Sequence, residues 1–444
     1  MSVETLFHAL AAGSVRVGDS VRSVAELAGV AVPHPVPWAP RERVAVVDER
    51  GASQLEAVFA IWQSGGVPIL GASDAELEAW HGPGVLWRWP GHRVRQGRCD
   101  EADDATAFVH RTSGSTGKAK FARRSFASLM REAEGYGALY GLRARDRAFL
   151  AAPIEHSFGF GAAFGVMMAG GVLDLAPTFL PRTLARRLTD GKTDVVVLTP
   201  TMAQLALQAA PNAESEHPVR CVIAGAGPVP DRLNEAFRHR FGVPIARNYG
   251  SSETGATLGM TDHSGESVVG RPFPGIRILA PCSGEAGELV LDLGTAALGY
   301  EGMPPDAGQG AGRWRTHDLA TVDEEGCVSL LGRLDDRVKI NGSLVDLGEL
   351  ARLAGSLPGV REAVALAEGR QDRPESADLV VFCAAEPDRA PGIAAAIGAA
   401  SGCVASVRLV DTLPRTAAGK PDTAALRRLL LKSVMPDAPE RVPE

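Results

Sequence analysis

Short apolar runs rich in β-branched residues alternate with helix-like segments along most of this 444-residue chain. Examples are "VAVVD", "LEAVFAIWQ" and "VPIL" in succession, and "RCVIAGAG" followed by "DRLNEAFRHRFG". A short apolar run bounded by turn residues is typical of a buried strand, and the longer segment after it predicts a crossover helix. This alternation predicts βαβ units around mainly parallel sheets.

The pattern changes twice toward the C-terminus. From about residue 272 to 329, shorter strand-like pieces such as "GELVLDL" are separated by Gly, Pro and Asp, which predicts a β-rich subdomain. Beyond "GRLDDRVK" the expected order is helix, strand, strand, helix, strand, helix, and a boundary near Asp335 leaves about 110 residues for a compact domain. We therefore expect an α/β protein. Its N-terminal domain spans residues 1–335, with parallel-type sheets, helices and the β-rich subdomain, and a small α+β domain spans 336–444.

Composition excludes several classes of protein. The net charge of −7 gives no basic surface for nucleic acid, and the six cysteines form no CxxC or zinc-type spacing, so we expect reduced thiols in the cytoplasm. The N-terminus lacks the basic start of a signal peptide. The uncharged run from Phe158 to Leu173 is shorter than the ~20 residues of a membrane span and rich in glycine, which favours a buried helix beside a cavity.

The loop "HRTSGSTGKAKF", residues 110–121, follows the predicted strand "ATAFVH". Gly114 and Gly117 permit close backbone approach, and hydroxyl and ammonium groups around them can donate to phosphate oxygens. The loop departs from a P-loop at Thr112 and Ala119, which disfavours a Walker-type NTPase. On composition alone it fits either a phosphate cradle or an ordinary Ser/Gly turn.

"TSGSTGKAK" also resembles the signature of the adenylate-forming superfamily, which usually reads TSGSTGxPK. Four further segments resemble that family in the same order: "NYGSSETG" (248–255), "RWRTHDL" (313–319), "GRLDDRVKINGSLVDLGEL" (332–350) and "RTAAGK" (415–420). The resemblance covers about residues 106 to 428. It implies a large domain and a small mobile C-terminal domain, and ATP- and Mg²⁺-dependent activation of a carboxylic acid as its acyl-AMP.

The resemblance also implies a nucleotide site. Glu253 matches the glutamate that holds Mg²⁺ against ATP phosphates, Tyr249 the residue beside adenine, and Asn248 is placed to read the adenine amino group. Asp318 and Arg333 match the residues that contact the ribose hydroxyls, and His317 stands where glycine is commoner. The implied nucleotide-binding residues are Thr112, Ser113, Gly114, Ser115, Thr116, Gly117, Lys118, Gly225, Ala226, Gly227, Asn248, Tyr249, Gly250, Ser252, Asp318 and Arg333.

The expected catalytic residues are Lys420, Glu253 and His156. Lys420 matches the lysine that bridges the acyl carboxylate and the α-phosphate, where negative charge grows as pyrophosphate leaves. The loop would grip the β- and γ-phosphates, with Lys118 as an auxiliary clamp on the departing charge.

After adenylation, the small domain of this family swings and presents another face to the thiol. Asp335 matches the hinge, and Lys339 and Gly342 are expected to line the thiol's tunnel. The arginines usual in that loop are Asn341 and Leu344 here. This departure leaves the thiol partner open.

The segment "PIEHSFGFG" bears on the acid. It carries His156, where aryl- and acyl-activating members have a His or an aromatic residue, and lacks the Asp that pairs with an amino acid's ammonium group. We expect an acid without an α-amine, aromatic or short, such as a hydroxybenzoate. Its pocket would include His156, Ser157, Phe158, Gly225 and Gly250, although His156 could instead be a core histidine with no role in binding.

The chain is also similar in size and motif style to stand-alone hydroxybenzoate ligases that load a carrier protein. This resemblance implies a stand-alone ligase that loads the phosphopantetheine thiol of an acyl carrier protein, with free CoA as the alternative acceptor. A catalytically silent homologue that binds nucleotide or acyl groups is a hypothesis of another class. Lys420, Glu253 and Asp318 together argue against it.

Overall fold

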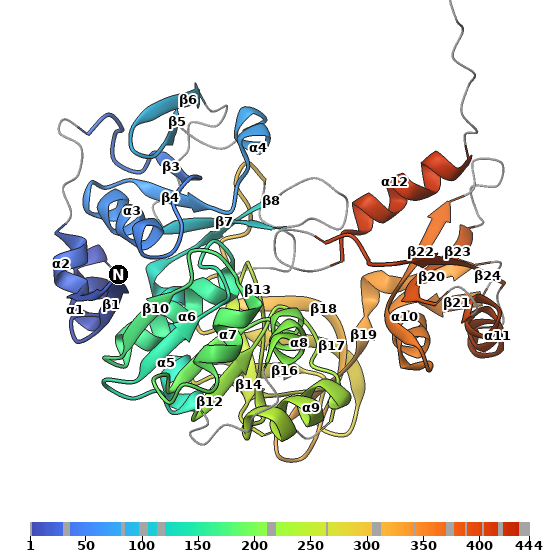
Figure 1. The fold of residues 1–444 in the computed structure, drawn as a ribbon. Helices are drawn as coiled ribbons and strands as arrows, with labels where there is room; N and C mark the ends of the chain where they lie inside the picture. The colour runs from blue at the N-terminus through green and yellow to red at the C-terminus, as the bar shows by residue number, and fades with distance from the viewer. Residues whose placement is uncertain are drawn as a thin grey trace, which may run out of the picture. The chain divides into compact units, whose positions relative to one another are not determined.

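A computed structural model describes residues 2–29, 36–80, 85–96, 105–112, 120–210, 219–262, 265–303, 312–340, 343–369, 377–386, 389–401, 404–415 and 421–434 (Figure 1). The chain forms two compact units. The first is Met1–Thr316 with Thr321–Leu330, and the second is His317–Ala320 with Leu331–Glu444. The predicted α/β class, with a larger sheet-rich N-terminal part and a smaller C-terminal part, is confirmed.

One sheet of the first unit has the strand order β6-β5-β3-β4-β7-β8. Strands β3, β4, β5 and β7 run parallel, and β6 and β8 close the edges in antiparallel pairs. All residues of β3 and β4 are buried because helix α3 packs on them, as expected for parallel strands (Figure 1). The bounds are β3 (Arg43–Val46), α3 (Ala52–Gln63), β4 (Val67–Leu70), α4 (Asp74–Glu78), β5 (Val85–Arg88), β6 (His92–Gln96), β7 (Phe108–Thr112) and β8 (Lys120–Arg124).

The second sheet joins a parallel half to an antiparallel half, in the order β16-β17-β18-β19-β15-β14-β13-β12-β11-β9-β10-β1-β2. Strands β1, β10, β9, β11, β12 and β13 are parallel, as the alternating pattern predicts. The parallel half and its edge consist of β1 (Ser14–Val17), β2 (Ser20–Ser23), β9 (Arg147–Leu150), β10 (Val172–Leu175), β11 (Val195–Leu198), β12 (Cys221–Ala224) and β13 (Ile245–Ser251). The antiparallel half contains the predicted β-rich subdomain and consists of β14 (Gly255–Met260), β15 (Val268–Pro272), β16 (Arg277–Ala280), β17 (Ala286–Asp292), β18 (Arg313–Val322) and β19 (Val328–Arg333).

Most of the glycine-rich run forms helix α6 (Ser157–Met168), which is buried from Gly159 to Met167, whereas the last two residues of the run, Val172 and Leu173, begin strand β10. It packs on α5 (Phe126–Tyr140) at very short range: a Cβ on Gly161 would lie 2.0 Å from Glu132 Oε1, and one on Gly165 would lie 2.5 Å from Tyr136 Cβ. The glycines are therefore needed for close helix packing. The other helices are α1 (Val3–Ala9), α2 (Val24–Ala28), α7 (Pro181–Arg187), α8 (Pro200–Ala209) and α9 (Asp231–Phe241). Within the ranges given above, no helix is both long and apolar enough to cross a membrane.

The second unit follows the predicted α+β order around the sheet β22-β23-β24. Successive side chains of β23 point to opposite faces of the sheet and pack in two different cores. Val381 packs in a cluster with residues of α10 and α11, and Phe382 packs in a cluster with Leu426 of α12. The bounds are η1 (Leu334–Asp336), β20 (Arg337–Ile340), β21 (Ser343–Asp346), α10 (Leu347–Ser356), β22 (Val360–Gly369), β23 (Ala377–Ala385), α11 (Ala390–Ser401), β24 (Ala405–Val410) and α12 (Thr423–Val434).

Candidate active site

The carboxyl ends of parallel strands β9, β12 and β13 meet at one edge of the second sheet, where ligands of α/β sheets collect. Three predicted segments follow these ends: 151–158 after β9, 225–227 after β12, and the "NYGSSETG" turn at the end of β13. The Ser157 hydroxyl lies 3.5 Å from the Ser251 carbonyl oxygen, and a Cβ on Gly225 would lie 2.6 Å from the Phe158 ring. The fold thus brings residues of all three segments into contact.

Backbone conformation at this edge is unusual. Ala226, between the two glycines, has a φ of 64°, a left-handed value that residues with a side chain rarely adopt. A Cβ on Gly250 would lie 2.1 Å from the Gly255 carbonyl oxygen, so the turn between β13 and β14 closes only with glycine there. Glu253 is presented at the tip of this tight turn.

Glu253 accepts a hydrogen bond of 2.6 Å at Oε1 from the Tyr300 hydroxyl. The ring of Tyr300 lies under Lys120, whose Nζ is 5.0 Å from the ring centroid. No cluster of three or more His, Cys, Asp or Glu side chains suited to a metal occurs among the described residues. One half-buried carboxylate fits Mg²⁺, which proteins commonly bind through one or two carboxylates together with substrate phosphates.

Buried charges of α5 support the same turn from behind. Glu132 pairs with Arg124 at 2.9 Å and accepts the Ala256 N–H at 2.7 Å. Arg131 donates to the Thr254 carbonyl oxygen at 2.7 Å, and burial, followed by the charge of Arg124, lowers the pKa of Arg131 to about 10. Buried charged side chains therefore hold the backbone on both sides of Gly255, at Thr254 and at Ala256.

Asn248 contacts α5. Its Nδ2 donates to the Tyr140 hydroxyl at 3.2 Å, and that hydroxyl donates to the Arg247 carbonyl oxygen at 2.6 Å. The side-chain oxygen of Asn248 then remains as the group able to accept from an adenine amino group. Recognition of adenine by Asn248 and Tyr249 stays a prediction.

His156 precedes α6 as its N-cap residue and lies close to the fully buried His110. Burial is the main reason why the pKa of His110 falls to about 3, with the charges of Arg124 and His156 acting in the same direction. His156 therefore borders both the predicted acyl segment and the aromatic core around His110. A catalytic or substrate-binding role for His156 stays a prediction.

Asp318 and Arg333 both belong to the second unit and form an ion pair of 3.0 Å. Asp318 is buried and Arg333 is half-exposed. His317 has a φ of 60°, so the backbone there is left-handed, which gives a physical reason why glycine is common at this place in the family. The predicted ribose-binding residues thus lie in contact with each other.

Several predicted residues lie outside the described part of the chain: Ser113, Gly114, Ser115, Thr116, Gly117, Lys118, Gly342 and Lys420. For Asp335 and Lys339 only the backbone is described, in η1 and β20. Thr112 pairs with Lys120 at the ends of the antiparallel strands β7 and β8. These strands therefore fix both ends of the predicted phosphate loop.

The sequence interpretation missed Tyr300, Lys120 and the buried charges of α5. Lys120 is the last residue of the quoted "TSGSTGKAK" motif, which was a usable signal. Glu132 and Arg131 could not be distinguished from surface charges by sequence, because only the packing of α6 against α5 buries them.

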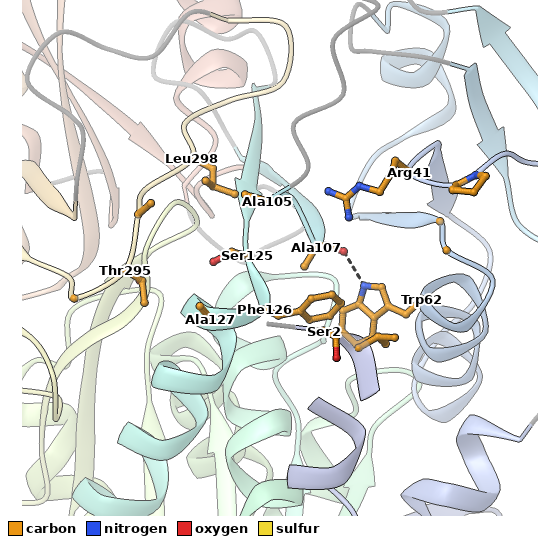
Figure 2. Close-up of a pocket in the computed structure, with 16 residues that line it drawn as sticks. Ser2, Arg41, Trp62, Ala105, Ala107, Ser125, Phe126, Ala127, Thr295 and Leu298 are labelled. Carbon is orange, nitrogen blue, oxygen red and sulfur yellow. Dashed lines mark hydrogen bonds between the residues drawn. The ribbon is translucent and has the colours of Figure 1, made fainter. Parts of the chain in front are cut away.

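A separate cavity of about 600 Å³ lies beside α3 and the start of α5 (Figure 2). Trp62 and Phe126 face each other there with ring centroids 5.2 Å apart, and Trp62 Nε1 donates to the Ala107 carbonyl oxygen at 2.7 Å. Arg41 and Thr295 add polar groups to its wall. Its lining contains none of the predicted site residues, so this cavity and the site at the strand ends are different places.

Comparison with known proteins identifies the family. The family of AMP-binding enzymes matches residues 72–301. The Delta-poly-L-ornithine synthetase of Acinetobacter baumannii (strain AB307-0294) is 27% identical over an alignment of 378 positions that covers 75% of this chain and 27% of that protein. The chain thus matches only about a quarter of that relative's length. The 2-succinylbenzoate–CoA ligase of Geobacillus kaustophilus (strain HTA426) is 27% identical over 88% of this chain and 79% of its own length.

The fold has a close counterpart among solved structures. The ATP-bound MatB of Rhodopseudomonas palustris superposes with a TM-score of 0.77, at 21% identity, over 97% of this chain and 99% of that one. The family match covers more than half of the chain and contains the phosphate loop, the strand-end segments, Glu253 and Tyr300. The chain therefore belongs to the AMP-binding enzymes, and so to the adenylate-forming superfamily of acyl- and aryl-CoA-synthetase-like ligases.

Proposed function

We propose that this adenylate-forming ligase activates an aromatic carboxylic acid and then transfers it to a phosphopantetheine thiol. In the first step the acid's carboxylate attacks the α-phosphorus of ATP, which forms acyl-AMP and releases pyrophosphate. In the second, a thiol attacks the acyl carbon and releases AMP. The observation that carries the proposal is the contact between the three strand-end segments, with Glu253 at the tip of the adjoining turn.

In this proposal Glu253 holds Mg²⁺, which supplies positive charge against the ATP phosphates. The loop 112–118 binds the β- and γ-phosphates, and Asp318 with Arg333 binds the ribose. Lys420 lies at the α-phosphate during adenylation and stabilises the negative charge that grows there. The hinge at Asp335, and the thiol tunnel with Lys339 and Gly342, belong to the second step.

The acid would lie between the start of α6 and the segment after β12. The ring of Phe158 packs against Gly225, and the α6 residues that follow are apolar and buried, so a flat ring without a charged amine suits this wall. His156 or Ser157 could bond a ring hydroxyl, which favours a hydroxybenzoate. Neither Gly225 nor any residue of α6 carries an acidic side chain, so this wall itself offers no counter-charge to an ammonium group, whose burial would be costly.

For the acceptor we propose an acyl carrier protein, on the basis of the resemblance of the motifs to those of carrier-loading aryl ligases. The loop residues Asn341 and Leu344 depart from the arginines usual in the family and do not distinguish the two acceptors. Free CoA is the second candidate, and the similarity to a 2-succinylbenzoate–CoA ligase favours it.

Acid-dependent exchange of pyrophosphate into ATP tests the first step. Hydroxybenzoates, benzoate, short and long fatty acids and amino acids are compared at equal concentration, with Glu253→Gln as the inactive control. Exchange with hydroxybenzoates above all others supports the proposal. A preference for amino or fatty acids contradicts the aromatic assignment, and no exchange with any acid favours the silent homologue.

The acceptor is tested with the best acid, using CoA and a holo-carrier protein from an aryl-acid pathway, each compared with its thiol-free form. A thioester on the carrier and none on CoA supports the proposal, and the reverse supports a CoA ligase.

A further inference from the structure

We propose that Tyr300 is a positioning residue for the metal: its hydroxyl fixes the carboxylate of Glu253 through Oε1 and leaves Oε2 as the oxygen that would hold Mg²⁺. This inference rests on the proposed function, because it takes Glu253 as the metal ligand. The hydroxyl donates to Oε1 at 2.6 Å, a length typical of a charge-assisted hydrogen bond. Among the described residues, this is the one hydrogen bond of the Glu253 carboxylate.

Tyr300 itself is held by its neighbours in sequence. The Arg123 N–H donates to the Gly299 carbonyl oxygen at 2.9 Å, and the Glu301 N–H donates to the Phe121 carbonyl oxygen at 2.8 Å. These bonds bracket Tyr300, which forms an antiparallel bridge with Ala122. The segment around Tyr300 thus adds to the edge of β8, the strand that follows the predicted phosphate loop.

A buried ion pair fixes this segment further. The Glu301 carboxylate is 2% exposed and accepts a hydrogen bond of 2.8 Å from Arg43 Nε, and Arg43 Nη2 lies 2.7 Å from the same oxygen in the ion pair. Arg43 on β3 is completely buried. Because a buried charge that loses its partner is strongly destabilising, Glu301 cannot easily leave this place. Its neighbour Tyr300 therefore has little freedom to move away from Glu253.

The ring of Tyr300 is covered by Lys120, which pairs across the strands with Thr112 at the start of the loop. One side chain thereby contacts both the strand that carries the phosphate loop and the carboxylate expected to hold Mg²⁺. Metal ligands commonly need such a hydrogen-bonded neighbour, and loss of the neighbour typically weakens metal binding about 10- to 100-fold.

The test compares Tyr300→Phe with the wild-type protein. Phenylalanine keeps the ring beneath Lys120 and removes only the hydroxyl. Mn²⁺ replaces Mg²⁺, and free Mn²⁺ is measured by electron paramagnetic resonance with enzyme and ATP and, as the reference, with ATP alone, so that chelation by ATP is subtracted. Acid is left out so that no turnover occurs. We expect the affinity for Mn²⁺ to fall about 10- to 100-fold, with unchanged affinity for metal-free ATP and an unchanged melting temperature. In exchange assays, the variant should need more Mg²⁺ but approach the wild-type rate at saturating Mg²⁺.

Thr189→Val is the control variant. It removes a hydroxyl that donates to the Ala185 and Arg186 carbonyl oxygens of α7, each 3.2 Å away, and it should leave Mn²⁺ affinity unchanged. Glu253→Gln and the double variant complete a mutant cycle. If Tyr300 acts through Glu253, adding Tyr300→Phe to Glu253→Gln causes no further loss of Mn²⁺ affinity.

The outcomes separate this inference from the proposed function. Unchanged or tighter Mn²⁺ binding by Tyr300→Phe overturns the positioning role alone, provided that Glu253→Gln binds Mn²⁺ weakly. Additive losses in the double variant also overturn it, because Tyr300 would then act by another route. Normal Mn²⁺ binding by Glu253→Gln overturns the metal assignment in the proposed function and this inference with it.

Discussion

The first unit should be less stable in mild acid, because His110 takes up a proton when the unit unfolds. The His110 side chain is buried between the rings of Phe108 and Phe160, at centroid distances of 5.4 Å and 5.0 Å. Burial, together with the nearby charges of Arg124 and His156, lowers the pKa from 6.5 to about 3, although the Ile154 backbone favours the charged ring slightly. The folded protein therefore keeps this ring neutral at pH values where the unfolded chain protonates it.

The sign and size of the effect follow from proton linkage. Because the pKa is lower in the folded state, the stabilisation is complete above pH 6.5 and is lost as the pH falls toward 3. One proton costs about 1.4 kcal/mol per pH unit in this window, so His110 alone should remove about 2 kcal/mol between pH 7.5 and 5.0.

The assay compares wild-type protein with His110→Leu, which keeps an apolar side chain of similar size and cannot titrate. All six tryptophans lie within residues 1–316, so their fluorescence during urea unfolding reports the first unit. The difference in unfolding free energy between the two proteins should shift by about 2 kcal/mol in favour of the variant from pH 7.5 to 5.0. Parallel stability curves across this range would refute the reasoning.

Three further changes test the site and its support. Glu132→Gln leaves Arg124 buried without its counter-charge and should lower the unfolding free energy of the first unit by about 3–5 kcal/mol; in urea unfolding, the double variant with Arg124→Met should lose less than the two single losses added together. Gly161→Ala would place a Cβ 2.0 Å from Glu132 Oε1 and should cost about 1–3 kcal/mol, whereas Gly137→Ala on α5, with nothing within 4 Å of its new Cβ, should stabilise by up to about 1 kcal/mol. Equal effects of the two glycine changes in the same assay would contradict the packing described for α6. Lys420→Ala should reduce pyrophosphate exchange far more than thioester formation from preformed acyl-AMP, and equal losses in both reactions would exclude its assignment to adenylation.

The sequence was sufficient for features that depend on local pattern. Buried parallel strands such as β3 and β12 follow from short β-branched runs, and the order of elements in the second unit follows from the change between strand and helix periods. The glycine-rich run was recognisable as a buried helix because it is too short for a membrane and too apolar for a surface.

Features that depend on long-range packing were not predictable. Tyr300 lies 47 residues from Glu253, and nothing near either residue indicates that the β8 edge holds them together. Charged residues on α5 look solvent-exposed in a sequence, yet Glu132 is 1% exposed because α6 and the β13–β14 turn cover it. The Asn248 motif gave no sign that its amide contacts Tyr140. Each of these three contacts forms only when an element distant in sequence packs against the residue.

The second unit consists of two separate stretches of the chain, and this restricts how the unit can be exchanged between related proteins by recombination. Four of its residues, His317–Ala320, lie inside the sequence of the first unit, and Asp318 among them pairs with Arg333. A recombination event at the junction 330–331 would transfer Arg333 but leave Asp318 with the recipient chain. Domain shuffling at this junction would therefore preserve the ion pair only if the incoming unit is compatible with the resident aspartate. A chimera should therefore take residues 317–320 and the part from residue 331 onward from the same parent protein.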